Sequence, residues 1–330
     1  MPADEVGMRK LWFGVLMALA IVTTVDALTW NEPWHEDVLK ASDSFVKVKV
    51  LSNDGSQARV EVVKSLGGLP TASEITVEDF FLLRIFSRSS GDSVKLPLTP
   101  DKTYYLFLKK DPDKNSYRLP TPTAGIAPVS GTDVVATYRH SYHQAVVPED
   151  VYAKTMQAIF EGSNGRSYDE AFVAAFLKEQ LGQPPSNWSG ENDPVITKRF
   201  FLQHVALETF YHLRKGADLA MLTPFLSSNS PHEQISACRA IGRIRSPESQ
   251  ELMMAFVERP HDGFAKVMCV WGLGEQDAKG ITSRLDEFLK TGTDQRTGFG
   301  GSIMDSRIAT VFPATVKEAI SRLLRGWSKP

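Results

Sequence analysis

Cysteine is scarce in this sequence, and neither sign of charge dominates it. The 330 residues include 2 cysteines, and the formal net charge is −2. Two cysteines are too few for a disulfide-dense scaffold or for a zinc module with four cysteine ligands. A nearly neutral chain also has no overall basic field that would hold nucleic acid or an anionic membrane. We therefore expect no nucleic-acid partner.

Long apolar runs and phosphate-binding motifs are lacking as well. The apolar run Leu11–Val22 has 12 residues, whereas a helix that spans a bilayer needs about 20. No Gly-x-x-x-x-Gly-Lys-Ser/Thr or Gly-x-Gly-x-x-Gly motif follows a strand-like segment, so the sequence indicates no phosphate-cradling site and we expect no cofactor. With 42% hydrophobic and 23% charged residues, the composition is that of an ordinary folded protein.

The first 27 residues follow the pattern of a secretory signal peptide. Arg9 and Lys10 supply a short positive region, Leu11–Val22 is apolar, and Val25-Asp26-Ala27 offers a cleavage site. We therefore expect residues 1–27 to be removed and the mature protein to be exported, periplasmic or secreted, with no membrane span after cleavage. The alternative is an uncleaved N-terminal anchor, and Met8 is an alternative start.

Residues 28–147 show the period of two that is typical of β-strands. In 44–50 and 58–64 apolar and charged residues alternate across the turn signal Asn53-Asp54-Gly55, which predicts a hairpin with one solvated face. The apolar segment 80–86 is expected to run through a core, and 103–108 carries the strongest strand signal. Several short strands separated by turns predict a small β-barrel, which leaves few exposed edges.

The order of these parts resembles an OB-like barrel of the netrin or metalloproteinase-inhibitor kind. The resemblance is carried by Phe45–Val50, by Arg59–Lys64 and by the strand Tyr105–Leu108 with its turn and Tyr117-Arg118-Leu119. It implies an OB-like barrel fold for this module. In those families cysteines pin the barrel, and in the inhibitors an N-terminal cysteine reaches a target metal. Because residues 28–147 contain no cysteine, no functional residue is carried over.

From Pro148 onward the apolar residues recur with the period of 3.6 that indicates helices. Residues 148–182 are predicted to form two connecting helices, the second of which ends at Gly182. The proline-rich segment 183–194 is predicted to be a linker, and residues 195–330 to form a repeat array. The predicted fold class is α+β, an N-terminal barrel followed by a C-terminal α-solenoid.

The array repeats itself in steps of about 30 to 35 residues, each step containing two helices. Residues 235–256 match residues 269–289, with Gly242 aligned to Gly274, and 303–327 supply a further, degenerate helix pair. One helix pair cannot bury both of its apolar faces, so stacking of successive pairs would supply the core.

The unit Ser236–Glu248 resembles the HEAT-like repeat of the bilin-lyase type. Ala240-Ile241-Gly242 matches its small-residue positions, and Ser246-Pro247-Glu248 matches its turn. The resemblance implies a right-handed stack of helices and a protein-binding surface. It implies no chemistry, since repeats of this type serve mainly as scaffolds.

His140 and His143 are the weak candidates for a metal site. Positions i and i+3 of a strand face opposite sides, and no carboxylate lies within four residues of this pair. We therefore favour a solvated loop or strand end and expect no metal. The segment His35-Glu36-Asp37 is interpreted as part of a flexible N-terminal tail.

Charged residues of the array supply the candidate binding residues. Residues 194–330 hold 18 Lys or Arg residues against 14 Asp or Glu residues. Arg239, Arg243 and Arg245 cluster around one turn, and Glu251 and Arg284 are further candidates. A site for an acidic partner is the functional interpretation, and a solvated turn is the alternative that we favour.

The two cysteines, Cys238 and Cys269, fall on the first helices of adjacent units. Export permits a disulfide. Stacked helices lie about 8–10 Å apart, however, which exceeds the usual Cα separation of a disulfide. We therefore favour two buried thiols.

The sequence supports three functions, in decreasing order. The first is an exported, non-enzymatic protein-binding or scaffold protein with a protein partner and an unassigned oligomeric state. The second is an exported hydrolase or lyase whose site lies between the two modules, with His140, His143 and Glu149 as candidates. The third is an extracellular protease inhibitor, which rests on the barrel resemblance alone.

Overall fold

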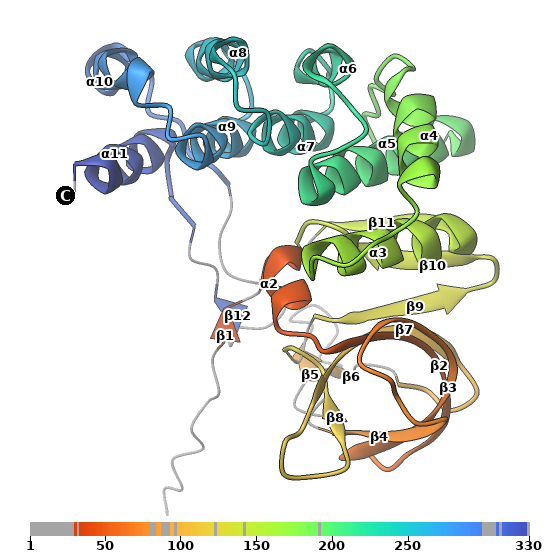
Figure 1. The fold of residues 1–330 in the computed structure, drawn as a ribbon. Coiled ribbons are helices and arrows are strands. Elements are labelled where there is room, and N and C mark those ends of the chain that lie inside the picture. The colour runs from red at the N-terminus through yellow and green to blue at the C-terminus, as the bar shows by residue number, and fades with distance from the viewer. Residues whose placement is uncertain are drawn as a thin grey trace, which may run out of the picture.

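The computed structural model describes residues 30–31, 33–78, 84–86, 93–95, 98–121, 124–140, 143–190, 193–298, 308–309 and 312–328. The expected signal peptide and residues 80–83 of the expected core strand lie outside these ranges. The described residues form a mixed α+β fold, in which a closed barrel of five strands is followed by a helical C-terminal half (Figure 1).

The barrel strands pair in the order β2-β3-β4-β8-β7, and β7 pairs with β2 to close the ring. Their bounds are β2 Ser44–Asn53, β3 Gln57–Gly68, β4 Glu74–Glu78, β7 Thr103–Lys110 and β8 Tyr117–Arg118. Only the β4–β8 pair of this ring is parallel. The strands predicted at 44–50, 58–64 and 103–108 are confirmed, because alternating apolar side chains fill the interior.

The two faces of β2 are both buried over part of its length. Val46 and Val48 point into the barrel, where they are 0% exposed. Phe45 points outward and packs between Phe107, at a ring distance of 4.6 Å, and Phe160 of α3 (Glu149–Ser163) at 6.0 Å. The prediction of one solvated face is therefore wrong at this end of the hairpin, because α3 covers it.

Three further strands extend the sheet from the barrel toward the helices. They are β9 Ile126–Ser130, β10 Asp133–Thr137 and β11 Gln144–Pro148, and they pair antiparallel in series from β7. The sequence analysis assigned no strands here, although buried and less buried residues alternate along β11. Two short pairs stand apart from this sheet: β5 Arg84–Phe86 with β6 Ser93–Lys95, and β1 Trp30–Asn31 with β12 Ile308–Ala309.

The helices of the C-terminal half lie in two rows (Figure 1). One row contains α5 Pro194–Leu213, α7 Pro231–Ile241, α9 Gly263–Glu275 and α11 Val316–Trp327, each packed on the next. The other contains α6 Leu219–Leu226, α8 Pro247–Glu258 and α10 Thr282–Thr291. Helix α10 follows the short 3-10 helix η1 Lys279–Ile281, and α4 Glu170–Leu181 packs on α5. The helices predicted within 148–182 are confirmed as α3 and α4.

Two expectations about the ends of the described chain are wrong. Of the expected helix pair in 303–327, the described residues form one helix, α11, and Ile308 lies in β12, which pairs with β1. His35-Glu36-Asp37 is not a flexible tail, because it begins helix α2 (His35–Lys40) and His35 is 3% exposed. Both corrections come from contacts between distant parts of the chain.

The predicted linker has no helix or strand over 183–190, but it is packed against the helices rather than loose. Ser186 is buried, and its backbone N–H donates to the side chains of Gln203 and Glu233. Trp188 stacks on Phe200 of α5 with ring centroids 4.6 Å apart. The segment is therefore fixed to α5 and α7.

Helices α7 and α9 approach closely enough to be covalently joined. Cys238 and Cys269 form a disulfide with a Cα separation of 4.8 Å. The preference for two free thiols is therefore wrong, because glycine lets these two backbones meet. A Cβ atom added to Gly242 would lie 2.7 Å from the Cα atom of Gly272, so neither position has room for a side chain.

Replacement of both cysteines by serine is expected to lower the free energy of unfolding by about 2–4 kcal/mol, because the bridge closes a loop of 31 residues in the unfolded chain. Urea unfolding with and without a reducing agent measures the effect. The reductant should destabilise the wild type and leave the double variant unchanged. Equal stability of wild type and double variant under oxidising conditions would contradict this assignment.

Candidate functional site

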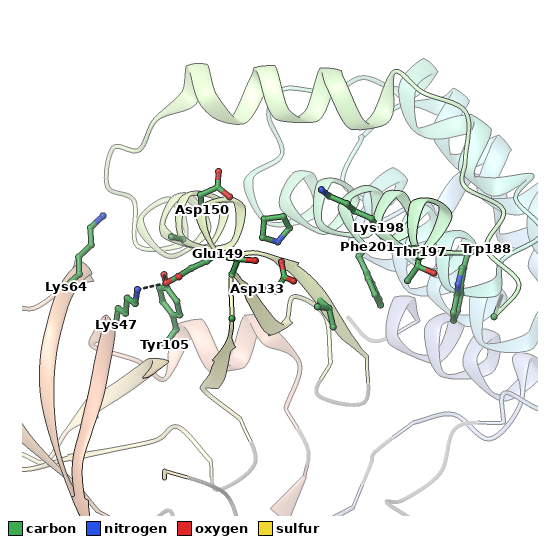
Figure 2. A pocket seen from close by; sticks show the side chains of 17 residues that line it. Lys47, Lys64, Tyr105, Asp133, Glu149, Asp150, Trp188, Thr197, Lys198 and Phe201 are labelled. Carbon is green, nitrogen blue, oxygen red and sulfur yellow. Dashed lines mark hydrogen bonds and ion pairs between the residues drawn. The ribbon is translucent and has the colours of Figure 1, made fainter. Parts of the chain in front are cut away.

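A cleft of about 1220 Å³ lies where the barrel module meets the helices. The barrel side contributes Lys47 of β2, Lys64 of β3 and Tyr105 of β7, as Figure 2 shows. The opposite side contributes Trp188 and the first turns of α5, including Lys198 and Phe201. The N-terminal end of α3, with Glu149 and Asp150, lies between them. Both modules are therefore needed to form this cleft.

Glu149 is the best-positioned carboxylate in the cleft. Its Oε1 atom lies 2.5 Å from the Lys47 ammonium and accepts a hydrogen bond from the Tyr105 hydroxyl at 2.8 Å (Figure 2). Partial burial raises the pKa of Glu149, but the hydrogen bonds from Lys47 and Tyr105 outweigh it, so the pKa lies below its ordinary value. Glu149 is thus ionised near neutral pH and fixes β2 and β7 to the start of α3.

The other charges of the cleft are of both signs. Lys64, Lys198 and Asp150 are exposed, and Asp133 is partly buried at the start of β10. No described ion pair involves any of these four side chains. The lining thus offers two cations and two carboxylates to a bound molecule. They lie beside the Glu149–Lys47 ion pair, in which the two charges balance.

One end of the cleft is apolar. Trp188 and Phe201 line it, and Phe200 supports Trp188 from behind. Val146 of β11, 45% exposed, lies along the same cleft. An aromatic wall next to charges of both signs is suited to a ligand that combines apolar and charged groups.

His140 and His143 do not line the cleft and are not solvated, so the favoured interpretation of a solvated loop is wrong. They are 3% and 9% exposed, because Trp34 packs against His140 and His204 against His143. The His140 ring contacts Trp34 edge-on at 5.1 Å, and the His143 ring lies 4.1 Å from that of His204. The two side chains therefore have different neighbours.

Arg239 lies in a buried ionic network rather than on a surface. The Glu208 carboxylate, 0% exposed, accepts hydrogen bonds from Arg239 Nε at 3.1 Å and from the Ser236 hydroxyl at 2.7 Å. Arg239 also donates to Glu36 of α2 at 3.0 Å, and Arg139 lies 4.0 Å from Glu208. The interpretation of Arg239 as part of a solvated turn is wrong, because its charge is used to join α2, α5 and α7.

The other four candidate binding residues lie nearer the surface. Arg243 pairs with Glu275 at 2.7 Å and covers the ring of Tyr211. Arg245 is exposed, with a hydrogen bond to the Glu275 carbonyl at 3.4 Å. The last two candidates, Glu251 and Arg284, form an ion pair at 2.6 Å. Arg284 also binds Glu258 at 2.6 Å. The five candidates therefore do not form one surface: Arg239 is buried, Arg243 and Arg245 contact Glu275, and Glu251 pairs with Arg284.

The described part of the chain contains no group of three or more His, Cys, Asp or Glu side chains arranged to hold a metal ion. None of its helices has both the length and the apolar character of a membrane span. Comparison with known proteins finds no family model, no curated protein and no solved structure that matches this chain. The site must therefore be interpreted from its own residues.

The carboxylate of Glu208 is expected to be essential for stability. Glu208→Gln should lower the free energy of unfolding by about 3–5 kcal/mol, because it leaves the buried Arg139 guanidinium without its counter-charge and leaves Arg239 with Glu36 alone. Arg284→Gln is the matched control, and because its ion pairs are largely exposed it should cost less than about 1 kcal/mol. Urea unfolding compares the two, and similar losses in both variants would refute the difference.

Proposed function

We propose that this protein is an exported, non-enzymatic binding protein that holds an extended polypeptide segment in the cleft between its barrel and its helices. The observation that carries the proposal is the composition of the cleft, in which an aromatic wall adjoins charges of both signs. A peptide offers these groups together, since an apolar side chain can pack on Trp188 while charged neighbours pair with Lys198, Asp133 or Asp150.

We further propose that the helical half is a short α-solenoid of HEAT-like pairs and that the barrel is OB-like. The two rows of helices, with α5, α7, α9 and α11 packed in succession, support the first assignment. The closed ring of five strands supports the second. Both architectures commonly present binding surfaces, which agrees with a binding role.

The proposal of export, to a periplasmic or secreted location, has support beyond the N-terminal sequence pattern. The disulfide between Cys238 and Cys269 is buried in the α7–α9 contact. Structural disulfides persist mainly in oxidising compartments. An exported chain would meet such a compartment, so the bridge and the predicted signal peptide favour the same location.

A hydrolase or lyase is the second candidate, because Asp133, Glu149 and Asp150 bring three carboxylates to one cleft. Glu149, however, is held ionised by Lys47 and Tyr105, so it is poorly suited to donate a proton near neutral pH. Mass spectrometry of a bound peptide after incubation tests a peptide-cleaving hydrolase, which would shorten the peptide, whereas a binding protein would leave it intact. The protease-inhibitor alternative rests on the barrel alone, and the described residues add nothing in its favour.

A random peptide library displayed on phage is expected to yield sequences that combine a large apolar residue with charged neighbours. Trp188→Ala should weaken the affinity of the selected synthetic peptide at least about tenfold, because aromatic anchors carry much of the energy of such contacts. Isothermal titration calorimetry measures the affinity.

Arg284→Ala is the matched control for this test, since Arg284 lies on α10 and away from the cleft lining. Its affinity should equal that of the wild type. The proposal fails if no sequence is enriched on the wild type, or if Trp188→Ala and Arg284→Ala bind the selected peptide equally well.

A further inference from the structure

Three histidines gather where the loop between β10 and β11 meets α5 and α7. The ring of His143 lies 4.1 Å from that of His204 and 4.9 Å from that of His232. His143 Nδ1 and His204 Nε2 are both buried and have no hydrogen-bond partner. A ring nitrogen in such a position is tolerated when the imidazole is neutral. If the nitrogen is protonated, the new N–H group has no hydrogen-bond acceptor nearby.

The hydrogen bonds of Ser236 fix the tautomer of His204. The Ser236 hydroxyl donates its hydrogen to Glu208 and accepts one from Arg139 Nη1 at 3.0 Å. His204 Nδ1 lies 3.1 Å from the same oxygen, and because the hydroxyl hydrogen is already used, Nδ1 must be the donor. Neutral His204 therefore carries its hydrogen on Nδ1, and Nε2 is the buried, unpartnered atom that acid would protonate.

The charges around this cluster oppose protonation. Burial lowers the pKa of His143 and His204 well below its ordinary value, and the nearby Arg139 guanidinium lowers both further. On α7, His232 also has a lowered pKa from burial and from Arg139, with Asp262 at the start of α9 acting in the opposite direction. The Glu208 carboxylate on α5, which accepts from the Ser236 hydroxyl beside His204, is already bound by Arg239.

We propose that His143 and His204 form an acid-sensitive latch that holds the barrel module to the helices and weakens as the pH falls below about 6.5. The latch is a property of the free chain and does not depend on the ligand proposed for the cleft. His143 comes from the loop of the barrel module, and His204 comes from α5, so their contact crosses the junction between the two parts. Separation of the parts would hydrate both rings and let them take up protons.

The direction of the effect follows from the two states. In the closed state the histidines stay neutral, whereas in the open state their pKa returns to about 6.5, so acid favours opening. Between pH 7.5 and pH 5.5 the opening equilibrium should rise about tenfold for each histidine that becomes solvated, or about a hundredfold for this pair. His35 and His212, a neighbouring pair 5.6 Å apart whose pKa values burial also lowers, act in the same direction.

The latch lies directly behind the cleft wall. The Phe200 ring contacts His143 at a ring distance of 6.3 Å and His232 at 6.2 Å, and it also stacks on Trp188 and contacts Phe201. Because one side of the cleft comes from the barrel module and the other from α5, opening of the latch would move these two sides apart. We expect the cleft to lose its shape over the same pH interval.

Hydrogen–deuterium exchange of the full chain, corrected for the intrinsic effect of pH, tests the latch. In the wild type, exchange of β11 and of the middle of α5 should rise at least about a hundredfold between pH 7.5 and pH 5.5, and α10 and α11 should change far less. A double variant, His143→Phe with His204→Asn, removes both titrating rings. Its increase in exchange between pH 7.5 and pH 5.5 should be about a hundredfold smaller than that of the wild type. His261→Gln is the control, because His261 stacks on Phe256, outside this junction, and it should behave as the wild type.

The latch is refuted if the wild type shows no extra exchange at pH 5.5, if α10 and α11 open equally, or if the double variant retains the full rise. A second measurement applies if the double variant does not fold. NMR titration of the wild-type ring signals should then show His143 and His204 neutral at pH 5.5 in the closed state. Protonation of either ring near pH 6.5 without opening would overturn the proposal.

Discussion

The arrangement of the two modules depends on the ion pairs that the buried Glu208 carboxylate forms with two arginines. Glu208 lies on α5, fully enclosed, between Arg239 of α7 and Arg139 of the barrel module. Arg239 in turn reaches Glu36 at the N-terminal end of the described chain. Because unpaired charges are very unfavourable in a protein interior, the ion pairs of this network require that α2, Arg139, α5 and α7 are all in place.

The cleft follows from this constraint. Its two sides come from the barrel and from α5, so its width is set by how the barrel sits on the helices. An apolar core reinforces the junction, since one buried cluster runs from Phe45 and Phe107 on the outer face of the sheet, through Phe160 of α3, to the helices of the array. The barrel interior forms a separate, smaller cluster. The outer face of the barrel thus shares its hydrophobic core with the helical half.

Local patterns predicted the elements well and the contacts between them poorly. The alternation at 44–50 and the helical period after Pro148 identified strands and helices correctly, because each reflects the burial of one face of a regular element. The pairing of Glu36 with Arg239 joins residues 203 positions apart, and no local pattern carries such information. The same reason explains the burial of His140 and His143, which their own neighbours in sequence do not indicate.

The candidate site was predicted only in outline. The sequence analysis placed a possible enzyme site between the modules and named Glu149, which lines the cleft. It did not name Lys47, Tyr105 or Trp188, because they belong to elements that meet only in the folded chain. The disulfide was judged against an average helix spacing, which the close approach of Gly242 and Gly272 shortens here.

The central claim is that the barrel and the helices form one fixed unit with a preformed cleft. Distance measurement by pulsed electron paramagnetic resonance, with spin labels on cysteines introduced at Lys64 and Lys198 on the two sides of the cleft (Figure 2), tests this claim most directly. At pH 7.5 the account predicts a single narrow distribution of distances. A broad or bimodal distribution would contradict it, because it would mean that the two parts move relative to each other.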